Sequence, residues 1–183
     1  MKQHGGQLRT DRITNKTIQK KNMTNFYNIR RQERTLSYDK AFELLQNAEY
    51  GFLSLGESKN GYAYGVPISF FFDMECNALY FHCALEGHKL ENIRRNNCVS
   101  FCVVGKTQTL PEKFATIYES VIVFGKAEIA TTDEEKRIAL TKLLEKYSPD
   151  HLDSGIKYME HAIHKTLTFK IKIDKITAKG RLS

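Results

Sequence analysis

The segment 62–72, YAYGVPISFFF, restricts the possible folds of this chain more than any other. It directly follows Asn60-Gly61, a pair that favours a tight hairpin because both central residues of such a turn need a positive φ. Pro67 lies in the middle of the segment and has no N–H to donate to a β-ladder. The segment is therefore predicted to be a strand at a sheet edge or a bulge, and bulges often lie next to ligand sites.

Apolar periodicity predicts that most of the chain forms antiparallel strands joined by hairpins, with helices between or before them. Ser37 is suited to cap the first helix, and Thr132 with Glu135 forms a capping box for another. Gly125 is expected to mark a bulge, and a polar loop is expected over 105–115. The predicted strands are 50–55, 62–72, 78–84, 98–104, 117–130 and 166–176, and the predicted helices are 38–48, 88–96, 133–147 and 155–164.

Long strands interrupted by glycine and proline favour a closed or nearly closed barrel, because bulges supply the curvature that closure needs. The predicted fold class is therefore mainly β with helices, a six-stranded antiparallel barrel with flanking helices. A chain of 183 residues is long enough for one domain with a sizeable core.

The positive charge of the chain is concentrated at its N-terminus. The net charge is +7, and residues 1–22 contain six Lys or Arg against one Asp, which leaves only +2 for the rest. We predict a disordered basic tail over 1–27, with Met23 as an alternative start, and a folded domain over 28–183. A nucleic-acid-binding tail is the alternative to a merely solvated one. No apolar run approaches the ~20 residues of a membrane span, so a cytoplasmic protein without a membrane partner is expected.

The other reactive residues give little support to metal or hydrolytic chemistry. Cys76, Cys83, Cys98 and Cys102 form no CxxC pair, so they are interpreted as buried free thiols in a reducing compartment rather than zinc ligands. His161 and His164 are three residues apart on a predicted helix, but no carboxylate pattern accompanies them, and no metal site is predicted. The chain has no GxSxG, Walker or GxGxxG motif.

The segment 82–89, HCALEGHK, is the strongest candidate site. It ends an apolar strand, turns at Gly87 and starts a helix, whose N-terminal N–H groups favour anions. His88 and Lys89 are unfavourable charges for that helix end unless an anion lies between them. The segment therefore predicts an anion site, most plausibly for a phosphate. His82 has two interpretations, a strand end that is hydrogen-bonded to backbone and a donor that lines a ligand pocket.

The order of these motifs resembles the FMN-binding split-barrel proteins. It is most similar to the nitroimidazole-resistance branch, which is related to pyridoxamine 5′-phosphate oxidase. The resemblance covers about residues 28–180. It is carried by V-P-x-x-F at 66–70, H-x-A-x-x-G-x-K at 82–89 and Y-x-S-V-x-x-x-G at 118–125, together with RRQERTLS at 30–37.

The resemblance implies a six-stranded split barrel that forms a homodimer with FMN in a cleft at the interface. It makes His82 a candidate catalytic residue near the substrate as well as a cofactor contact, and it leaves open whether His82 or Lys89 meets the phosphate. The implied contacts are Val66, Pro67, Ile68, Ser69 and Phe70 along the isoalloxazine; His82, Cys83 and Lys89 at the phosphate; Ser120 and Val121 from the partner chain; and Lys179 or Arg181 at the phosphate or the rim.

The implied function is that of an FMN-dependent oxidoreductase, in which the flavin carries the chemistry and the protein orients it. NADH or NADPH would be the donor and a small molecule such as a nitroimidazole the acceptor, although the sequence shows no nicotinamide-binding motif. The alternative is a non-catalytic barrel that binds flavin or haem, with His82, His161 and His164 as candidate axial ligands. The sequence leaves the physiological substrate open.

Overall fold

The computed structural model describes residues 26–57 and 59–182, apart from the side chain of Glu57. Residues 1–25 of the predicted basic tail, including Met23, lie outside the described residues. The chain divides into two units, Met1–Arg30 and Arg31–Ser183, and all helices and strands of the described part belong to the second.

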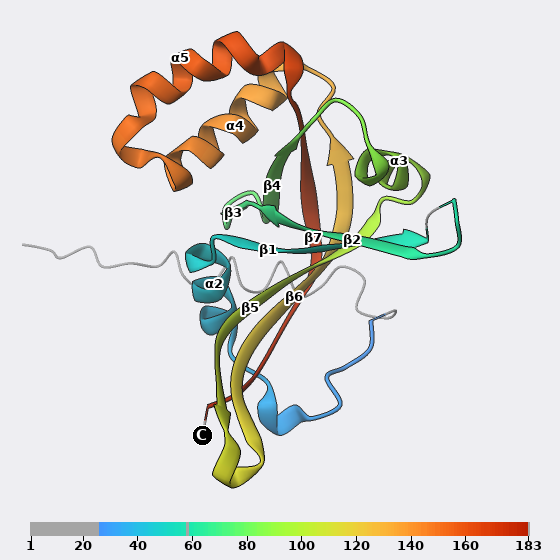
Figure 1. The fold of residues 1–183 in the computed structure, drawn as a ribbon, viewed down its shortest axis with the longest axis vertical. Helices are drawn as coiled ribbons and strands as arrows, with labels where there is room; N and C mark the ends of the chain where they lie inside the picture. The colour runs from blue at the N-terminus through green and yellow to red at the C-terminus, as the bar shows by residue number, and fades with distance from the viewer. Residues whose placement is uncertain (1–25, 58, 183) are drawn as a thin grey trace, which may run out of the picture. The chain divides into compact units, whose positions relative to one another are not determined.

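The described part of the second unit contains seven β-strands and four α-helices, connected by turns and short 3₁₀ segments (Figure 1). The strands are β1 (Tyr50–Glu57), β2 (Ala63–Ser69), β3 (Phe71–Asp73), β4 (Ala78–Cys83), β5 (Cys98–Leu110), β6 (Ala115–Ile129) and β7 (Leu167–Arg181). The helices are α2 (Tyr38–Asn47), α3 (His88–Arg95), α4 (Asp133–Tyr147) and α5 (Leu152–Ala162).

The local sequence signals act as predicted at three element boundaries. The backbone N–H of Lys40 donates to the Ser37 hydroxyl over 3.2 Å at the start of α2. Thr132 and Glu135 form a reciprocal capping box at the start of α4. Gly61 has a φ of 83° in the turn between β1 and β2, which confirms the predicted hairpin.

All strand pairs are antiparallel, and the order in the sheet is β2-β1-β5-β6-β7-β4-β3. The two edge strands, β2 and β3, are separated in sequence by the single residue Phe70. A flat sheet of seven strands would hold its edges about 29 Å apart, whereas one residue spans at most about 3.6 Å. The sheet must therefore curl until its edges meet at Phe70, which forms the seam of a barrel.

Several boundaries differ from the sequence-based prediction. The expected strand 62–72 is divided at Phe70 into β2 and β3, so there are seven strands and not six. Pro67 lies in an edge strand, and the register shifts between Phe124 and Gly125, so both of these expectations are confirmed.

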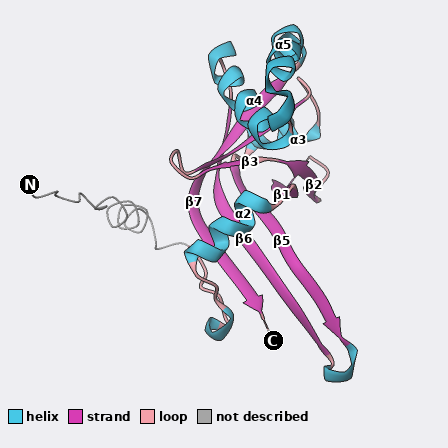
Figure 2. Ribbon diagram, turned by 90° about the vertical axis from the view of Figure 1, so that its left-hand side faces the viewer, coloured by secondary structure: helices cyan, strands magenta, loops and turns pink. Residues whose placement is uncertain are grey.

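The polar loop expected over 105–115 is much shorter in the structure, where only the 3₁₀ turn Pro111–Lys113 and Phe114 connect the two strands. The rest of the stretch forms the ends of β5 and β6, which remain paired as far as Leu110 opposite Ala115 and extend beyond the rest of the sheet (Figure 2). The two ends carry mostly exposed side chains, so backbone pairing holds them together rather than burial. Strand β7 also continues beyond its expected end at residue 176, and it pairs with β6 as far as Arg181 opposite Tyr118.

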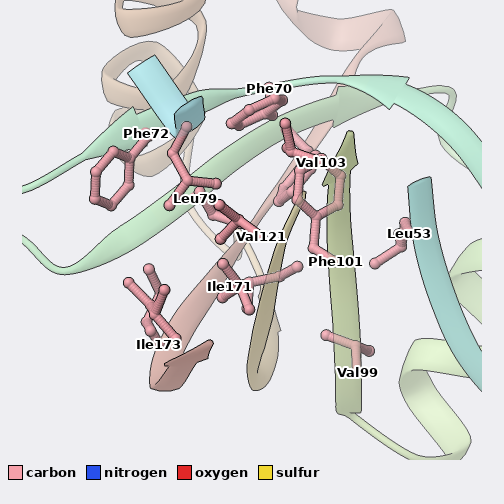
Figure 3. Packing of buried hydrophobic residues seen from close by; sticks show 14 of the residues in the cluster. Leu53, Phe70, Phe72, Leu79, Val99, Phe101, Val103, Val121, Ile171 and Ile173 are labelled. Atoms are coloured by element: carbon pink, nitrogen blue, oxygen red, sulfur yellow. The ribbon is translucent and has the colours of Figure 1, made fainter. Parts of the chain in front are cut away.

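The barrel interior is filled by apolar side chains from every strand, several of which are shown in Figure 3. Phe70 packs against Phe101 with ring centroids 4.7 Å apart, and Phe81 stacks on Phe169 at the same separation. All four rings are 0–1% exposed. Burying one such side chain contributes about 1.5–3 kcal/mol, so this aromatic cluster is a major stabilising feature. Phe70, the residue at the seam, is part of the cluster.

The C-terminal end of α4 fastens the seam from outside. The Lys146 ammonium donates to the carbonyls of Ala48 and Phe70 over 2.7 and 2.9 Å. The Tyr147 hydroxyl accepts from the N–H of Phe70 over 2.9 Å and donates to the carbonyl of Glu49. One turn earlier, Lys142 pairs with the buried Asp73 of β3 over 2.5 Å. One helix end therefore binds β3 and the chain on either side of the seam.

The cysteines differ from expectation in their burial. All four are free, but Cys76 and Cys98 are exposed, and Cys83 and Cys102 are half-buried. Cys76 lies in the turn between β3 and β4, and Cys98 begins β5 beside a turn. Neighbouring apolar residues in the sequence therefore did not place these thiols inside the barrel.

Replacing Tyr147 by Phe should destabilise the domain by about 1–3 kcal/mol, because the buried N–H of Phe70 loses its acceptor. The measurement is urea unfolding of the full chain. Tyr158→Phe is the control, since that ring is 75% exposed, and it should change stability by less than about 0.5 kcal/mol. Equal effects of the two substitutions would show that Tyr147 does not secure the seam.

Candidate functional site

The connection between β4 and α3 has the geometry of an anion site. Gly87 precedes the helix with φ 132° and ψ 168°, a region that essentially only glycine adopts. A Cβ at Gly87 would meet nothing within 4 Å, so the backbone conformation, and not crowding, favours glycine there. No side chain caps the first turn of α3. Its N-terminal N–H groups are therefore suited to bind an anion.

Two histidines and one lysine lie at the same connection, hereafter the β4–α3 corner (residues 82–89), which also contains Glu86. The pKa of His82 is lowered, first by withdrawal of water from its ring and then by the charge of Lys89. Burial raises the pKa of the Cys83 thiol, while Lys89 and Arg94 act against that rise. Among the described residues, Lys89 forms no ion pair within 4 Å. Its ammonium lies over the ring of Phe169, 5.7 Å from the centroid. The corner thus provides a cation at a helix N-terminus that no described carboxylate pairs with.

Strand β2 passes beside this corner with one edge unpaired. The ring of Tyr64 on β2 contacts the ring of His88 at 5.6 Å, and Lys59 in the turn before β2 pairs with Glu91 of α3 over 3.5 Å. At the other end of β2, Ser69 lines the same cavity as His82. Since β2 pairs only with β1, its other edge carries free backbone N–H and C=O groups near the corner.

The predicted isoalloxazine contacts lie on two faces of this segment. Val66 and Ile68 pack against the barrel core, whereas Pro67 is exposed and Ser69 is half-buried. Phe70 is completely buried in the aromatic cluster. Pro67 and Ser69 can therefore offer side chains to a ligand outside the barrel, while a contact at Phe70 would have to use its backbone.

The other predicted contacts lie far from the corner in a single chain. The Ser120 hydroxyl donates to the carbonyl of Lys179 over 3.3 Å, and Val121 is fully buried. Lys179 follows Thr168, the residue opposite His82 on β7, by eleven residues, which corresponds to roughly 35 Å of extended strand. The structure therefore brings Ser69, His82 and Lys89 into one region and leaves Ser120 and Lys179 in another.

Some residues near the two regions were missed by sequence reasoning. Tyr64 meets the corner through its contact with His88. Tyr147 lines the cavity that contains His82. Beside Lys179, a hydrogen bond from Arg34 lowers the pKa of Tyr118. Tyr118 begins the Y-x-S-V-x-x-x-G motif, but it was not among the predicted contacts. The positions of Tyr64 and Tyr147 follow from strand pairing and helix packing between distant segments.

Two other classes of site have no support in the described residues. No group of three or more His, Cys, Asp or Glu side chains there could hold a metal ion. None of the helices in residues 26–57 and 59–182 is long and apolar enough to cross a membrane.

The curled antiparallel sheet with helices outside it is a split β-barrel. The family model for pyridoxamine 5′-phosphate oxidase matches residues 37–180, and the chain therefore belongs to the pyridoxamine 5′-phosphate oxidase-like split-barrel family. No curated protein sequence is significantly similar to the chain.

Solved structures share this fold. One is a candidate 5-nitroimidazole antibiotic resistance protein from Bacteroides thetaiotaomicron, with 24% identity, a TM-score of 0.64, and coverage of 79% of this chain and 84% of that one. A FAD-binding protein from Mesorhizobium loti has 23% identity, a TM-score of 0.56, and coverage of 81% and 97%. A FAD- and haem-binding protein from Mycobacterium smegmatis has 18% identity, a TM-score of 0.66, and coverage of 83% and 75%.

The depressed pKa of His82 predicts a pH dependence of stability. Between the pKa in the folded protein and the ordinary value of 6.5, the unfolded chain binds more protons than the folded one. The free energy of unfolding should therefore fall as the pH is lowered through this window. His82→Gln should remove that part of the fall, as measured by urea unfolding at several pH values in buffers free of phosphate.

His164→Gln is the control for this prediction, because His164 is not among the residues that line the cavity with His82. It should keep the pH dependence of the wild type. The account of His82 would be contradicted if the His82 variant also kept that dependence unchanged.

Proposed function

We propose that the chain binds FMN at the β4–α3 corner and along the outer side of β2. The observation that carries this proposal is Lys89, which forms no ion pair with a described residue and lies beside the uncapped start of α3, with the free edge of β2 next to it. The two features suit the two ends of FMN. The corner offers a cation and N–H groups to a phosphate, and the strand edge offers hydrogen-bonding groups to a flat polar ring.

Each residue then has a definite task. Lys89 donates a charge-assisted hydrogen bond to the phosphate, and Gly87 lets the chain enter α3 without a side chain in the way. Ser69 and the backbone of β2 hydrogen-bond the ring edge, and the exposed Pro67 packs against the ring. His82 lies between the two ends and can donate to either the cofactor or a substrate. When bound, FMN supplies the hydride- and electron-transfer chemistry.

We further propose that the protein is an FMN-dependent oxidoreductase that reduces a small acceptor, with NADH or NADPH as donor. The shared fold with a candidate nitroimidazole resistance protein supports a nitroimidazole-like acceptor. The shared fold with a protein that binds FAD and haem supports a non-catalytic binder as second candidate. Reduction of bound FMN by NADH or NADPH in an anaerobic cuvette distinguishes the two, because a binder would leave the flavin oxidised.

The proposed functional unit is a homodimer. Residues directly opposite each other on neighbouring strands point to the same face, and one such row on the outer face is Pro67, Phe52, Cys102 and Ile122. Phe52 is 47% exposed and Ile122 37%, and Val104, two residues after Cys102 on β5, is 64% exposed. Such an apolar sheet face is suited to pack against a second copy.

A second copy would also complete the cofactor site. Ser120 and Lys179 lie in register with Val104, on the same outer face as the apolar row. Packing two such faces together would bring the Ser120–Lys179 region of one copy toward the β4–α3 corner of the other. The resulting dimer has two equivalent FMN sites, each built from both chains.

Lys89→Ala should weaken FMN binding by about 1.5–3 kcal/mol, since it removes a charge-assisted hydrogen bond. The measurement is quenching of flavin fluorescence during titration with protein. Arg95→Ala is the control, because it removes one positive charge from the exposed last turn of the same helix. An FMN affinity that falls equally in both variants would reduce the role of Lys89 to general electrostatic attraction.

The shared site predicts complementation between two variants that each bind FMN weakly. In a mixture of Lys89→Ala and Lys179→Ala chains, unfolded and refolded together, half of the dimers combine one chain of each kind. Each mixed dimer has one intact site, so about a quarter of all sites should recover tight binding. A site built from two chains would be contradicted if the mixture bound no more FMN tightly than the two variants do when each is refolded alone.

A further inference from the structure

A cavity of about 350 Å³ lies between helices α4 and α5 and the end of β4. The two helices pack against each other, and α4 also packs against β3 and β4 (Figure 1). Apolar side chains of the helices form most of the wall, including Leu140, Leu143, Leu144 and Met159. Ser69 and His82 contribute polar groups from the strands.

The size and chemistry of this cavity indicate a ligand site rather than a packing defect. The cavity volume falls within the range of small-molecule sites, about 300–1,000 Å³. No Asp, Glu, Lys or Arg lines it. An uncharged ligand fits such walls, because a charged group would lose its water without gaining an opposite charge.

Small residues on α5 keep the cavity open. Gly155 faces α4, and a Cβ there would lie 2.8 Å from a terminal methyl carbon of Leu144. Ala162, the last residue of α5, also lines the cavity. Gly155 therefore lets α5 approach Leu144 closely, and a side chain there would have to shift Leu144, which also lines the cavity.

Two of the polar residues that line the cavity, Ser69 and His82, belong to the region proposed for the flavin. Ser69 ends β2, and His82 lies beside Lys89 at the β4–α3 corner. A molecule in the cavity would thus have its apolar part between the helices and a polar end next to His82 and the flavin ring.

We propose that this cavity binds an uncharged, mainly apolar small molecule whose hydrogen-bond acceptor contacts His82 and Ser69. The inference rests on the proposed function in one respect, namely that this molecule belongs to the class of acceptor that reduced FMN would reduce. The binding itself depends only on the cavity.

The test uses the full chain and the neutral fluorescent probe N-phenyl-1-naphthylamine, first without and then with added FMN. The wild type should increase the probe fluorescence in a saturable manner. Ala162→Phe should weaken probe binding about tenfold or more by filling the cavity. Lys157→Phe adds the same ring at an exposed position of α5 and should keep the affinity within about twofold.

Gly155→Ala provides a second, milder variant. Alanine favours helix formation over glycine by about 1 kcal/mol, and its Cβ displaces Leu144 toward the cavity. Probe binding should again weaken. If Ala162→Phe does not fold, Gly155→Ala is the variant that tests the proposal. The proposal is overturned if the wild type does not bind the probe, or if the folded cavity variants bind it as the wild type does. If the wild-type protein binds the probe but does not bind FMN, the result counts against the proposed function alone.

Discussion

The seam at Phe70 is the constraint on which the rest of the structure depends. Strands β2 and β3 are one stretch of chain, yet they form opposite edges of the sheet, so a single residue closes the barrel. Phe70 is held from inside by the rings of Phe81 and Phe101, and from outside by Lys146 and Tyr147 of α4. Core packing and the polar contacts of one helix end therefore act on the same residue.

The candidate site follows from this closure. Because the edges meet at Phe70, Ser69 comes to lie with His82 at one cavity, although β1, β5, β6 and β7 lie between β2 and β4 in the order of the sheet. The far edge of β2 stays unpaired beside the β4–α3 corner, where Tyr64 touches His88. The unpaired edge of β2 thus brings free backbone groups next to Lys89.

Local signals allowed much of the fold and one half of the site to be predicted. The caps at Ser37 and Thr132, the Asn60-Gly61 turn, the edge position of Pro67 and the bulge at Gly125 follow from the chemistry of single residues. The paired ends of β5 and β6 did not, because their side chains are mostly exposed and carry no burial period. Tyr64, Tyr147 and the cavity between α4 and α5 were also missed, since they depend on contacts between distant segments. The grouping of Ser120 with Lys179, away from Lys89, required the strand register.

The central claim is that this chain holds FMN, and the visible absorption spectrum of the full chain tests it most directly. Protein equilibrated with FMN and then freed of unbound ligand by gel filtration should retain the two-banded spectrum of an oxidised flavin, at about one FMN per chain. A colourless protein would contradict the claim. A Soret band in the protein as purified, without retained flavin, would favour the haem-binding alternative.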